Sequence, residues 1–135
     1  MSTGYSGTPL ARKLGLKPGM RAWFDAMPDS VYDEIHSVEP NIAIDPDNLD
    51  GLDAVHVFVI ARSDLERSLA MWRKQIVSDG FIWVSWPKKA SKVPTDITED
   101  TIREVALPIG LVDVKVCAVD AVWSGLKLVI RKELR

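Results

Sequence analysis

Residues 80–92 read Gly-Phe-Ile-Trp-Val-Ser-Trp-Pro-Lys-Lys-Ala-Ser-Lys, an apolar run that ends abruptly in a proline and two lysines. The run predicts a buried strand from Phe81 to Trp86, because short β-branched and aromatic runs bounded by glycine and proline are typical of strands. In an open parallel sheet, ligands bind just beyond the carboxyl ends of the strands. We therefore expect any ligand site to lie beside Trp86, Lys88 and Lys89.

The composition is that of an ordinary globular protein. The 135 residues, 47% apolar and 27% charged, suffice for one domain with a hydrophobic core, and we expect a single domain over residues 1–135. A formal net charge of −2 indicates neither nucleic acid nor a membrane surface as partner. Met1 to Gly15 lacks the apolar core of a signal peptide, and no apolar run is long enough to span a bilayer. These features predict a cytoplasmic protein.

A second apolar run, Ala54 to Ile60, predicts a neighbouring strand that is covered on both faces. Ser63 and Glu66 follow it with the spacing of a capping box and predict a helix that runs to about Val77. The apolar positions of this helix recur at helical spacing: Leu65, Leu69, Trp72 and Ile76. Strand, helix and strand together predict a parallel pair with a crossover helix.

The flanking segments supply further elements. Before the first apolar run we expect a helix over 9–14, a strand over 20–24, a helix over 28–36 and a strand over 41–44. The segment 1–15 is expected to pack on the sheet. After the basic loop, a capping signal at Asp96–Glu99 predicts a helix with an apolar stripe: Ile102, Val105, Ala106 and Ile109. Alternating apolar residues then predict strands over 112–118 and 126–131, joined as an antiparallel hairpin.

Together these elements predict an α/β fold: a three-layer, Rossmann-like open sheet that is mostly parallel, with helices on both faces. We expect the strand order 2-1-3-4-6-5, with a C-terminal antiparallel hairpin at one edge. A ligand pocket is expected between the carboxyl ends of strands one and four.

Several blocks of sequence resemble a family of small bacterial proteins of unknown function. They are Gly4-Tyr-Ser-Gly-Thr-Pro-Leu10, Trp86-Pro-Lys-Lys89, Thr95-Asp-Ile-Thr-Glu-Asp100, Lys115-Val-Cys-Ala-Val-Asp120 and Trp123-Ser-Gly-Leu126. Because the blocks extend over nearly the whole chain, the chain is identified as a member of that family. Membership implies the fold and brings no known activity.

The layout is also similar to the class I methyltransferase fold, shortened by about one strand–helix unit. "Leu-Lys-Pro-Gly-Met-Arg" before strand one and "Val-Ser-Asp-Gly-Phe-Ile-Trp-Val" resemble segments of such enzymes. This resemblance implies S-adenosylmethionine as a cofactor, with Asp25 and Asp45 in place of the enzymes' acidic residues. Against it, the enzymes' first loop is rich in glycine, whereas Asp25-Ala-Met-Pro-Asp29 contains none.

The basic loop after Trp86 is the main candidate site. Lys88 and Lys89 can neutralise a phosphate or a carboxylate, Ser91 can add a hydroxyl, and Trp86 can offer a stacking surface. The alternative is a solvated basic loop, with the tryptophan filling the end of the sheet. One further segment is a candidate. The small residues 4–8, with Tyr5, Arg12 and Lys13, form either an anion-binding lid over this loop or a terminal segment packed across the sheet.

Other reactive residues have plainer interpretations. Cys117 lies mid-strand without a histidine nearby in the sequence pattern, which favours a packed, unreactive thiol. His36 and His56 show no metal-ligand spacing, so we expect no metal site. Asp120 is typical of a residue that holds a turn.

Three hypotheses follow. The first is a non-catalytic or regulatory module that binds a small anionic ligand at the carboxyl edge of the sheet. The second is a group-transfer enzyme that uses S-adenosylmethionine with an atypical cofactor loop. The third is a structural or protein-interaction domain, in which exposed tryptophans or a homodimer across the hairpin edge form the interface. No complete set of catalytic residues is recognisable.

Overall fold

The computed structural model describes residues 8–44 and 47–135, and in this part of the chain five strands form one sheet. The strands are β1 (Ala22–Asp25), β2 (Leu52–Phe58), β3 (Ile76–Pro87), β4 (Leu111–Ala118) and β5 (Trp123–Ile130). The α-helices are α1 (Leu10–Lys13), α2 (Asp29–Val38), α3 (Arg62–Trp72) and α4 (Glu99–Ala106). Short 3-10 turns lie at Lys89–Ser91, Leu107–Ile109 and Lys132–Leu134.

The strand order is β1-β2-β3-β5-β4, which confirms the predicted sheet and its C-terminal hairpin. Strands β1, β2 and β3 pair in parallel, whereas β5 pairs antiparallel with both β3 and β4. Half of the four pairings are therefore antiparallel, so the sheet is less parallel than predicted. The expected strand over 41–44 is reduced to one parallel bridge between Arg21 and Ala43. The sequence that follows, Asp-Pro-Asp-Asn, favours a turn over a longer ladder.

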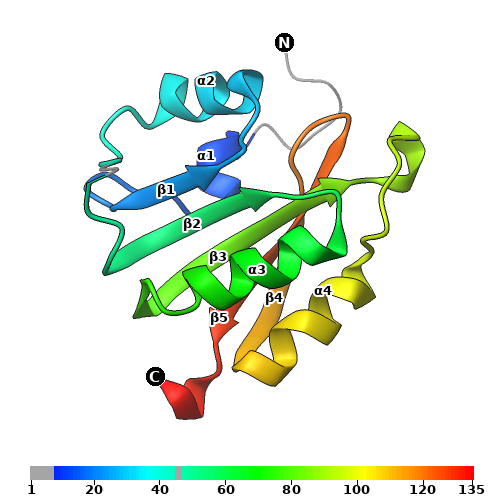
Figure 1. Cartoon of the computed structure of the whole chain (residues 1–135). Coiled ribbons are helices and arrows are strands. Elements are labelled where there is room, and N and C mark those ends of the chain that lie inside the picture. Colours follow the sequence, from blue (N-terminus) through cyan, green and yellow to red (C-terminus); the bar gives the residue numbers. More distant parts are fainter. Residues whose placement is uncertain (1–7, 45–46) are drawn as a thin grey trace.

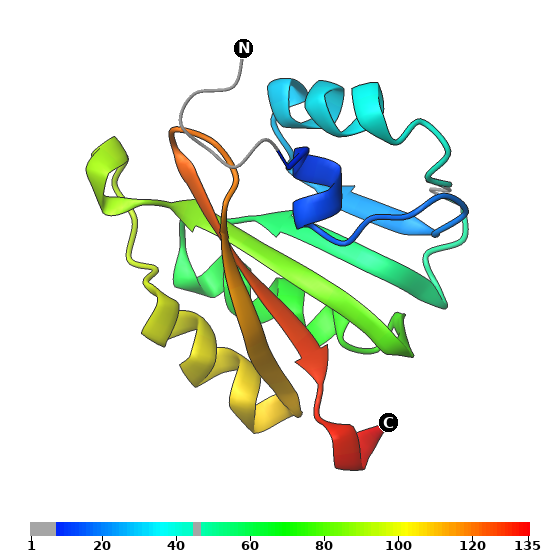
Figure 2. The same ribbon diagram turned by 180° about the vertical axis from the view of Figure 1, so that it is seen from behind.

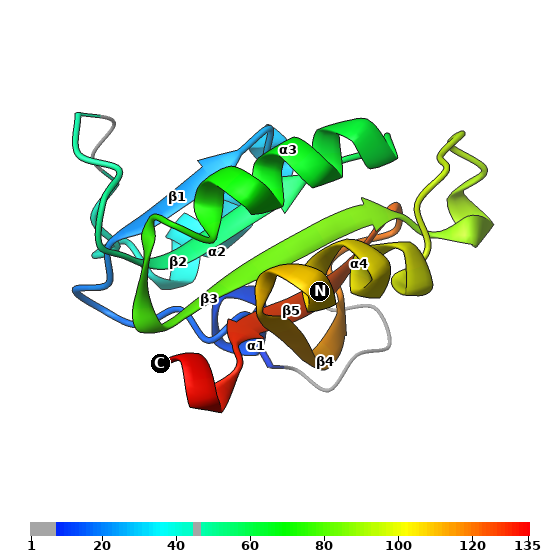
Figure 3. The ribbon, with the colours of Figure 1, turned by 60° about the horizontal axis from the view of Figure 1, so that its bottom comes forward.

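Helices cover both faces of the sheet, so the fold has three layers (Figures 1 and 2). Figure 3 shows α3 and α1 on opposite sides of the strands. Strand β3 serves both faces, because successive side chains alternate in direction. Ile82 and Val84 pack with α3 and α4 in one apolar cluster, while Phe81 and Trp83 pack with α1 and α2 in another. We refer to these as the α3–α4 face and the α1–α2 face.

Two predicted details of α3 are wrong. The helix begins at Arg62 and carries no side-chain cap of its own, so Ser63 and Glu66 form no capping box. Asp96, from the loop before α4, accepts a hydrogen bond from the Arg62 backbone N–H at 2.8 Å and satisfies this donor instead. The helix also ends at Trp72 and not near Val77, because residues from Ile76 onward form β3.

Helix α4 starts with a different cap from the one expected. Thr98 is the N-cap, and its side chain and that of Thr101 each bond to the other's backbone N–H. Asp96 does not cap α4, because its side chain accepts the hydrogen bond from the Arg62 N–H at the start of α3. In the hairpin, the Asp120 side chain accepts hydrogen bonds from Val122 and Trp123, each at 2.8 Å, so it holds the turn as predicted.

Across the described residues, none of the helices combines the length and the apolar character that crossing a bilayer requires.

Candidate functional site

Two cavities lie at the carboxyl edge of the sheet. The larger, of about 730 Å³, lies beyond β3, between the loop 88–97 and the start of α4. The smaller, of about 420 Å³, lies where β1 and β2 end against α3. Both volumes fall within the range of roughly 300 to 1,000 Å³ that is usual for small-molecule sites. The sequence predicted a pocket between the ends of its first and fourth strands, which are β1 and β3 in the structure, and neither cavity lies at that position. We name them the loop–α4 cavity and the β1–α3 cavity.

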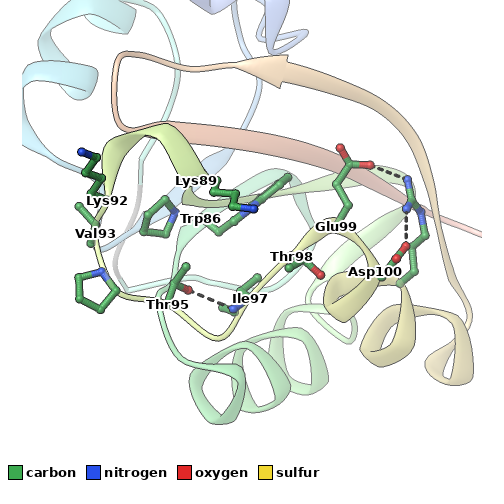
Figure 4. A pocket seen from close by; sticks show the side chains of 12 residues that line it. Trp86, Lys89, Lys92, Val93, Thr95, Ile97, Thr98, Glu99 and Asp100 are labelled. Carbon is green, nitrogen blue, oxygen red and sulfur yellow. Dashed lines mark hydrogen bonds and ion pairs between the residues drawn. The ribbon is translucent and has the colours of Figure 1, made fainter.

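The loop–α4 cavity has an apolar floor and a charged rim (Figure 4). Its lining consists of Trp86, Pro87, Lys89, Lys92, Val93, Pro94, Thr95, Ile97, Thr98, Glu99, Asp100 and Arg103. Trp86 and Ile97 are buried at 7% and 2% exposure, so they close the bottom and offer little surface for stacking. Lys89 and Lys92 lie toward one end, and Glu99 and Asp100 lie at the other.

The acidic end of this cavity is bound by one arginine, whose single positive charge leaves three carboxylates with an excess of negative charge. Arg103 bonds to Glu99 at 2.8 Å, to Asp100 at 3.0 Å and to Asp113 of β4 at 3.1 Å. The hydrogen bonds to Asp113 and Glu99 raise the pKa of Arg103 further above its ordinary value. By contrast, neither Lys89 nor Lys92 forms an ion pair within the described part of the chain. The cavity therefore has a cationic end at these two lysines and an opposite end where negative charge remains in excess.

The structure brings together only some of the residues predicted for this loop. Trp86 and Lys89 line the cavity, whereas Lys88 does not. The Ser91 hydroxyl donates to the Lys88 carbonyl at 2.7 Å and accepts from the Val93 N–H at 3.3 Å, so it holds the loop's own turn. Lys92, the last residue of the candidate stretch, also lines the cavity. Sequence reasoning missed Arg103, because its approach depends on how α4 packs on the sheet.

The remaining predicted residues lie elsewhere. Tyr5 falls outside the described residues, so the proposed lid is not tested. Arg12 is exposed on α1, a helix that packs on the α1–α2 face, whereas α4 belongs to the opposite face. Asp25 lines the β1–α3 cavity.

The β1–α3 cavity is built around the turn that follows β1. It is lined by Asp25, Ala26, Phe58, Val59, Asp64, Arg67, Ser68 and Met71. Ala26 has a φ of 58°, in the left-handed region that glycine adopts readily and alanine adopts rarely. The turn thus takes a glycine-like backbone conformation although the loop has no glycine. The Ala26 side chain adds one methyl group to the wall of the cavity, which a glycine at this position would not.

Polar side chains are also buried inside the α1–α2 face. His56 Nε2 and Ser85 Oγ lie 2.6 Å apart, and both residues are almost inaccessible. Burial lowers the pKa of His56 to about 3, so the ring is neutral at physiological pH. Its Nδ1 atom meets no partner among the described residues. The apolar run Ala54 to Ile60 placed His56 in a strand covered on both faces, but the pairing with Ser85 depends on the register of β2 and β3.

Two other candidates have structural roles. Cys117 is buried opposite Gly125, and desolvation raises its pKa, which agrees with an unreactive thiol. Trp123 is partly buried and packs edge-on against Phe58 at the border of the apolar cluster on the α1–α2 face, with ring centroids 5.1 Å apart. One edge of the indole is therefore engaged within the fold.

Solved structures with this fold include several methyltransferases. Ribosomal protein L11 methylase from Lactobacillus delbrueckii subsp. bulgaricus matches with a TM-score of 0.62 at 10% identity, over 90% of this chain and 75% of that one. Precorrin-6y C5,15-methyltransferase from Geobacter metallireducens GS-15 matches with a TM-score of 0.61 at 15% identity, over 91% of this chain and 85% of that one. Fibrillarin from Aeropyrum pernix, solved with natively bound S-adenosyl-L-methionine, matches with a TM-score of 0.54 at 13% identity, over 93% of this chain and 70% of that one.

At these identities the similarity establishes a methyltransferase-like fold and nothing finer. The comparison with curated proteins finds no match. A family model matches residues 11–132, which is most of the sequence. The chain therefore belongs to the family described as "Protein of unknown function (DUF3052)".

Proposed function

We propose that the chain is the cofactor-binding core of a group-transfer enzyme and that it holds S-adenosylmethionine at the carboxyl ends of β1 and β2. The observation that carries this proposal is the left-handed Ala26 directly after β1, on the wall of the β1–α3 cavity. It supplies the turn for which the enzymes of this fold use glycine. The fold shared with methyltransferases over about nine tenths of the chain supports the same function.

Three residues of this chain would hold the cofactor. The Ala26 turn would bring the backbone close to the ligand, Asp25 would place a carboxylate beside a cationic group, and Val59 would provide apolar contact. When bound, S-adenosylmethionine supplies an electrophilic methyl group. Opposite charges attract strongly in a partly dry cavity, so Asp25 suits a sulfonium or an ammonium group.

Isothermal titration calorimetry with S-adenosylmethionine tests this proposal. Ala26→Gly removes the methyl group and relieves the backbone strain, so we expect binding at least as tight as in the wild type. Ala26→Asn keeps a residue that tolerates a left-handed φ but fills the wall of the cavity, so we expect at least a tenfold loss of affinity. The absence of saturable heat with the wild type, or equal affinity of Ala26→Gly and Ala26→Asn, would contradict the proposal.

A matched control comes from the other cavity. Lys92 also has a left-handed φ, of 61°, so Lys92→Asn introduces the same residue in the same conformation. Because Lys92 lines the loop–α4 cavity, this variant should bind S-adenosylmethionine like the wild type.

A second candidate function is a non-catalytic module that binds a small anionic ligand in the loop–α4 cavity. The observation that favours it is the unpaired charge of Lys89 and Lys92 above an apolar floor, at the end of the cavity away from Glu99 and Asp100, which bind Arg103. Such a cavity suits a molecule with an apolar body and one acidic group. In this function, binding would alter the loop 88–97 without any reaction.

Equilibrium binding with a panel of aromatic carboxylates and nucleotides tests the second candidate. We expect Lys89→Gln combined with Lys92→Asn to weaken binding at least tenfold, because two of the cavity's cations are lost. Lys88→Gln is the control: it removes an adjacent lysine that does not line the cavity, so affinity should change less than twofold. Equal effects of the two variants would mean that the loop acts only through its general charge and would contradict this candidate.

A further inference from the structure

Lys127 occupies an unusual position for a lysine, on an interior strand of the sheet. In β5 it pairs with Trp83 of β3 on one side and with Lys115 of β4 on the other. Directly opposite residues on neighbouring strands have Cβ atoms about 5 Å apart, and like charges there are destabilising. The register of the hairpin therefore places two lysine side chains directly opposite each other on the same face of the sheet.

The position of the Lys127 head group is constrained. Its Nζ atom lies 4.4 Å from the centroid of the Phe81 ring. A Cβ added to Gly15 would come within 3.5 Å of the same nitrogen, so the backbone after α1 borders it closely. That backbone is fixed to the sheet, because the Trp83 indole donates a hydrogen bond to the Leu14 carbonyl at 2.8 Å. The ammonium group is therefore held between an aromatic ring and a fixed main-chain segment.

A third lysine lies close by, and no carboxylate compensates the group. Lys17 follows Gly15 by two residues, on the same connection. Within the described residues, Lys17, Lys115 and Lys127 form no ion pair with Asp or Glu. Desolvation, followed by the charges of Lys115 and Lys17, lowers the pKa of Lys127. The cluster thus carries an electrostatic cost in a protein whose net charge is −2.

We propose that Lys17, Lys115 and Lys127 form a binding site for the phosphate group of a small phosphorylated molecule. Lysine binds phosphate as a point charge, and a dianion between three ammonium groups removes their mutual repulsion. The three side chains come from the connection after α1, from β4 and from β5, and in the proposed site they would approach the anion from separate segments. This site lies on the α1–α2 face and is separate from the loop–α4 cavity and from the proposed cofactor site.

Thermal unfolding in matched anions tests this site. At equal ionic strength, pyrophosphate should raise the Tm of the wild type by about 3 °C or more relative to chloride, because a ligand that binds only the native state stabilises it. Citrate should raise it by less than half as much. Equal shifts with citrate, or no excess over chloride, would overturn the assignment to phosphate.

Variants separate a binding role from a structural one. Lys127→Met keeps the length of the side chain, so in chloride its Tm should equal or exceed that of the wild type, and the excess shift with pyrophosphate should disappear. Lys74→Met, on the exposed turn after α3, should keep the whole shift. Lys115→Thr changes only the exposed edge strand and tests the site even if Lys127→Met folds poorly; it should lose most of the shift. A full pyrophosphate response in Lys115→Thr or in a folded Lys127→Met would refute the proposal.

Discussion

The two faces of the sheet are built differently although β3 contributes to both. On the α3–α4 face the buried residues are apolar almost without exception, and two regular helices cover them. On the α1–α2 face the cover includes a helix of four residues, and the core contains the His56–Ser85 pair and the Trp83–Leu14 hydrogen bond. A short helix buries too little apolar surface to hold itself in place, so directional bonds anchor it. Polar chemistry inside the fold therefore concentrates on that face.

The strongest test of this difference is the same substitution on opposite faces of one strand. Trp83→Phe removes the indole N–H that satisfies the buried Leu14 carbonyl, so we expect a loss of about 3 kcal/mol in the free energy of unfolding. Trp86→Phe removes no such bond and should cost about 1 kcal/mol. Urea denaturation of the two variants measures both values. If their costs were equal, the anchoring role of the indole bond would be wrong.

A smaller effect should appear as a pH dependence that arises on the α1–α2 face alone. The pKa of His56 is lowered from 6.5 to about 3 in the folded protein, so the unfolded chain binds the additional proton between these values. Stability is therefore lost as the pH falls below about 6.5, with a loss of about 2 kcal/mol between pH 7 and pH 5.

His56→Gln should be less stable at pH 7 but should lack this share of the pH dependence, as measured by urea denaturation at both pH values. The control is His36→Gln, on the surface of α2, which should retain the wild-type slope. An unchanged slope in His56→Gln would show that His56 does not titrate as its burial requires.

The smallest predicted change in the free energy of unfolding concerns the α3–α4 face and comes from the side-chain cap of α3. Asp96→Ala should cost about 1 kcal/mol, because the Arg62 N–H at the start of α3 loses its acceptor. Ser63→Ala should cost less than about 0.3 kcal/mol, since the Ser63 side chain caps nothing. The pair discriminates between a cap supplied by the helix's own sequence and one supplied from a distant loop. A larger cost for Ser63→Ala would restore the capping box that the sequence suggests.

Much of the architecture could be predicted from local patterns. The apolar run before Pro87 and the alternation in 112–118 and 126–131 led to the strand order and the hairpin, because side-chain periodicity reports which faces of an element are covered. Errors occurred where two patterns overlapped. Ile76 continued the helical spacing of α3 yet starts β3, and Ser63 had the spacing of a cap that Asp96 supplies from another part of the chain.

The candidate site was less predictable. The sequence placed basic residues after Trp86, and Lys89 does line a cavity there, but Ser91 is engaged in its own turn and Asp25 belongs to a different cavity. Lys92 lines the cavity from the same loop, and Arg103 joins it through the packing of α4. The absence of glycine after β1 suggested a changed cofactor loop, whereas Ala26 adopts the left-handed turn without it.

By itself, the sequence determined the kind of most elements, because hydrophobic periodicity reports which faces are covered, and the order of the main strands followed from the usual crossovers between parallel strands. Only the tertiary structure decided which polar groups meet. The Arg62–Asp96, His56–Ser85 and Trp83–Leu14 contacts join residues 34, 29 and 69 positions apart. Such contacts depend on strand register and on helix packing, which local periodicity does not specify.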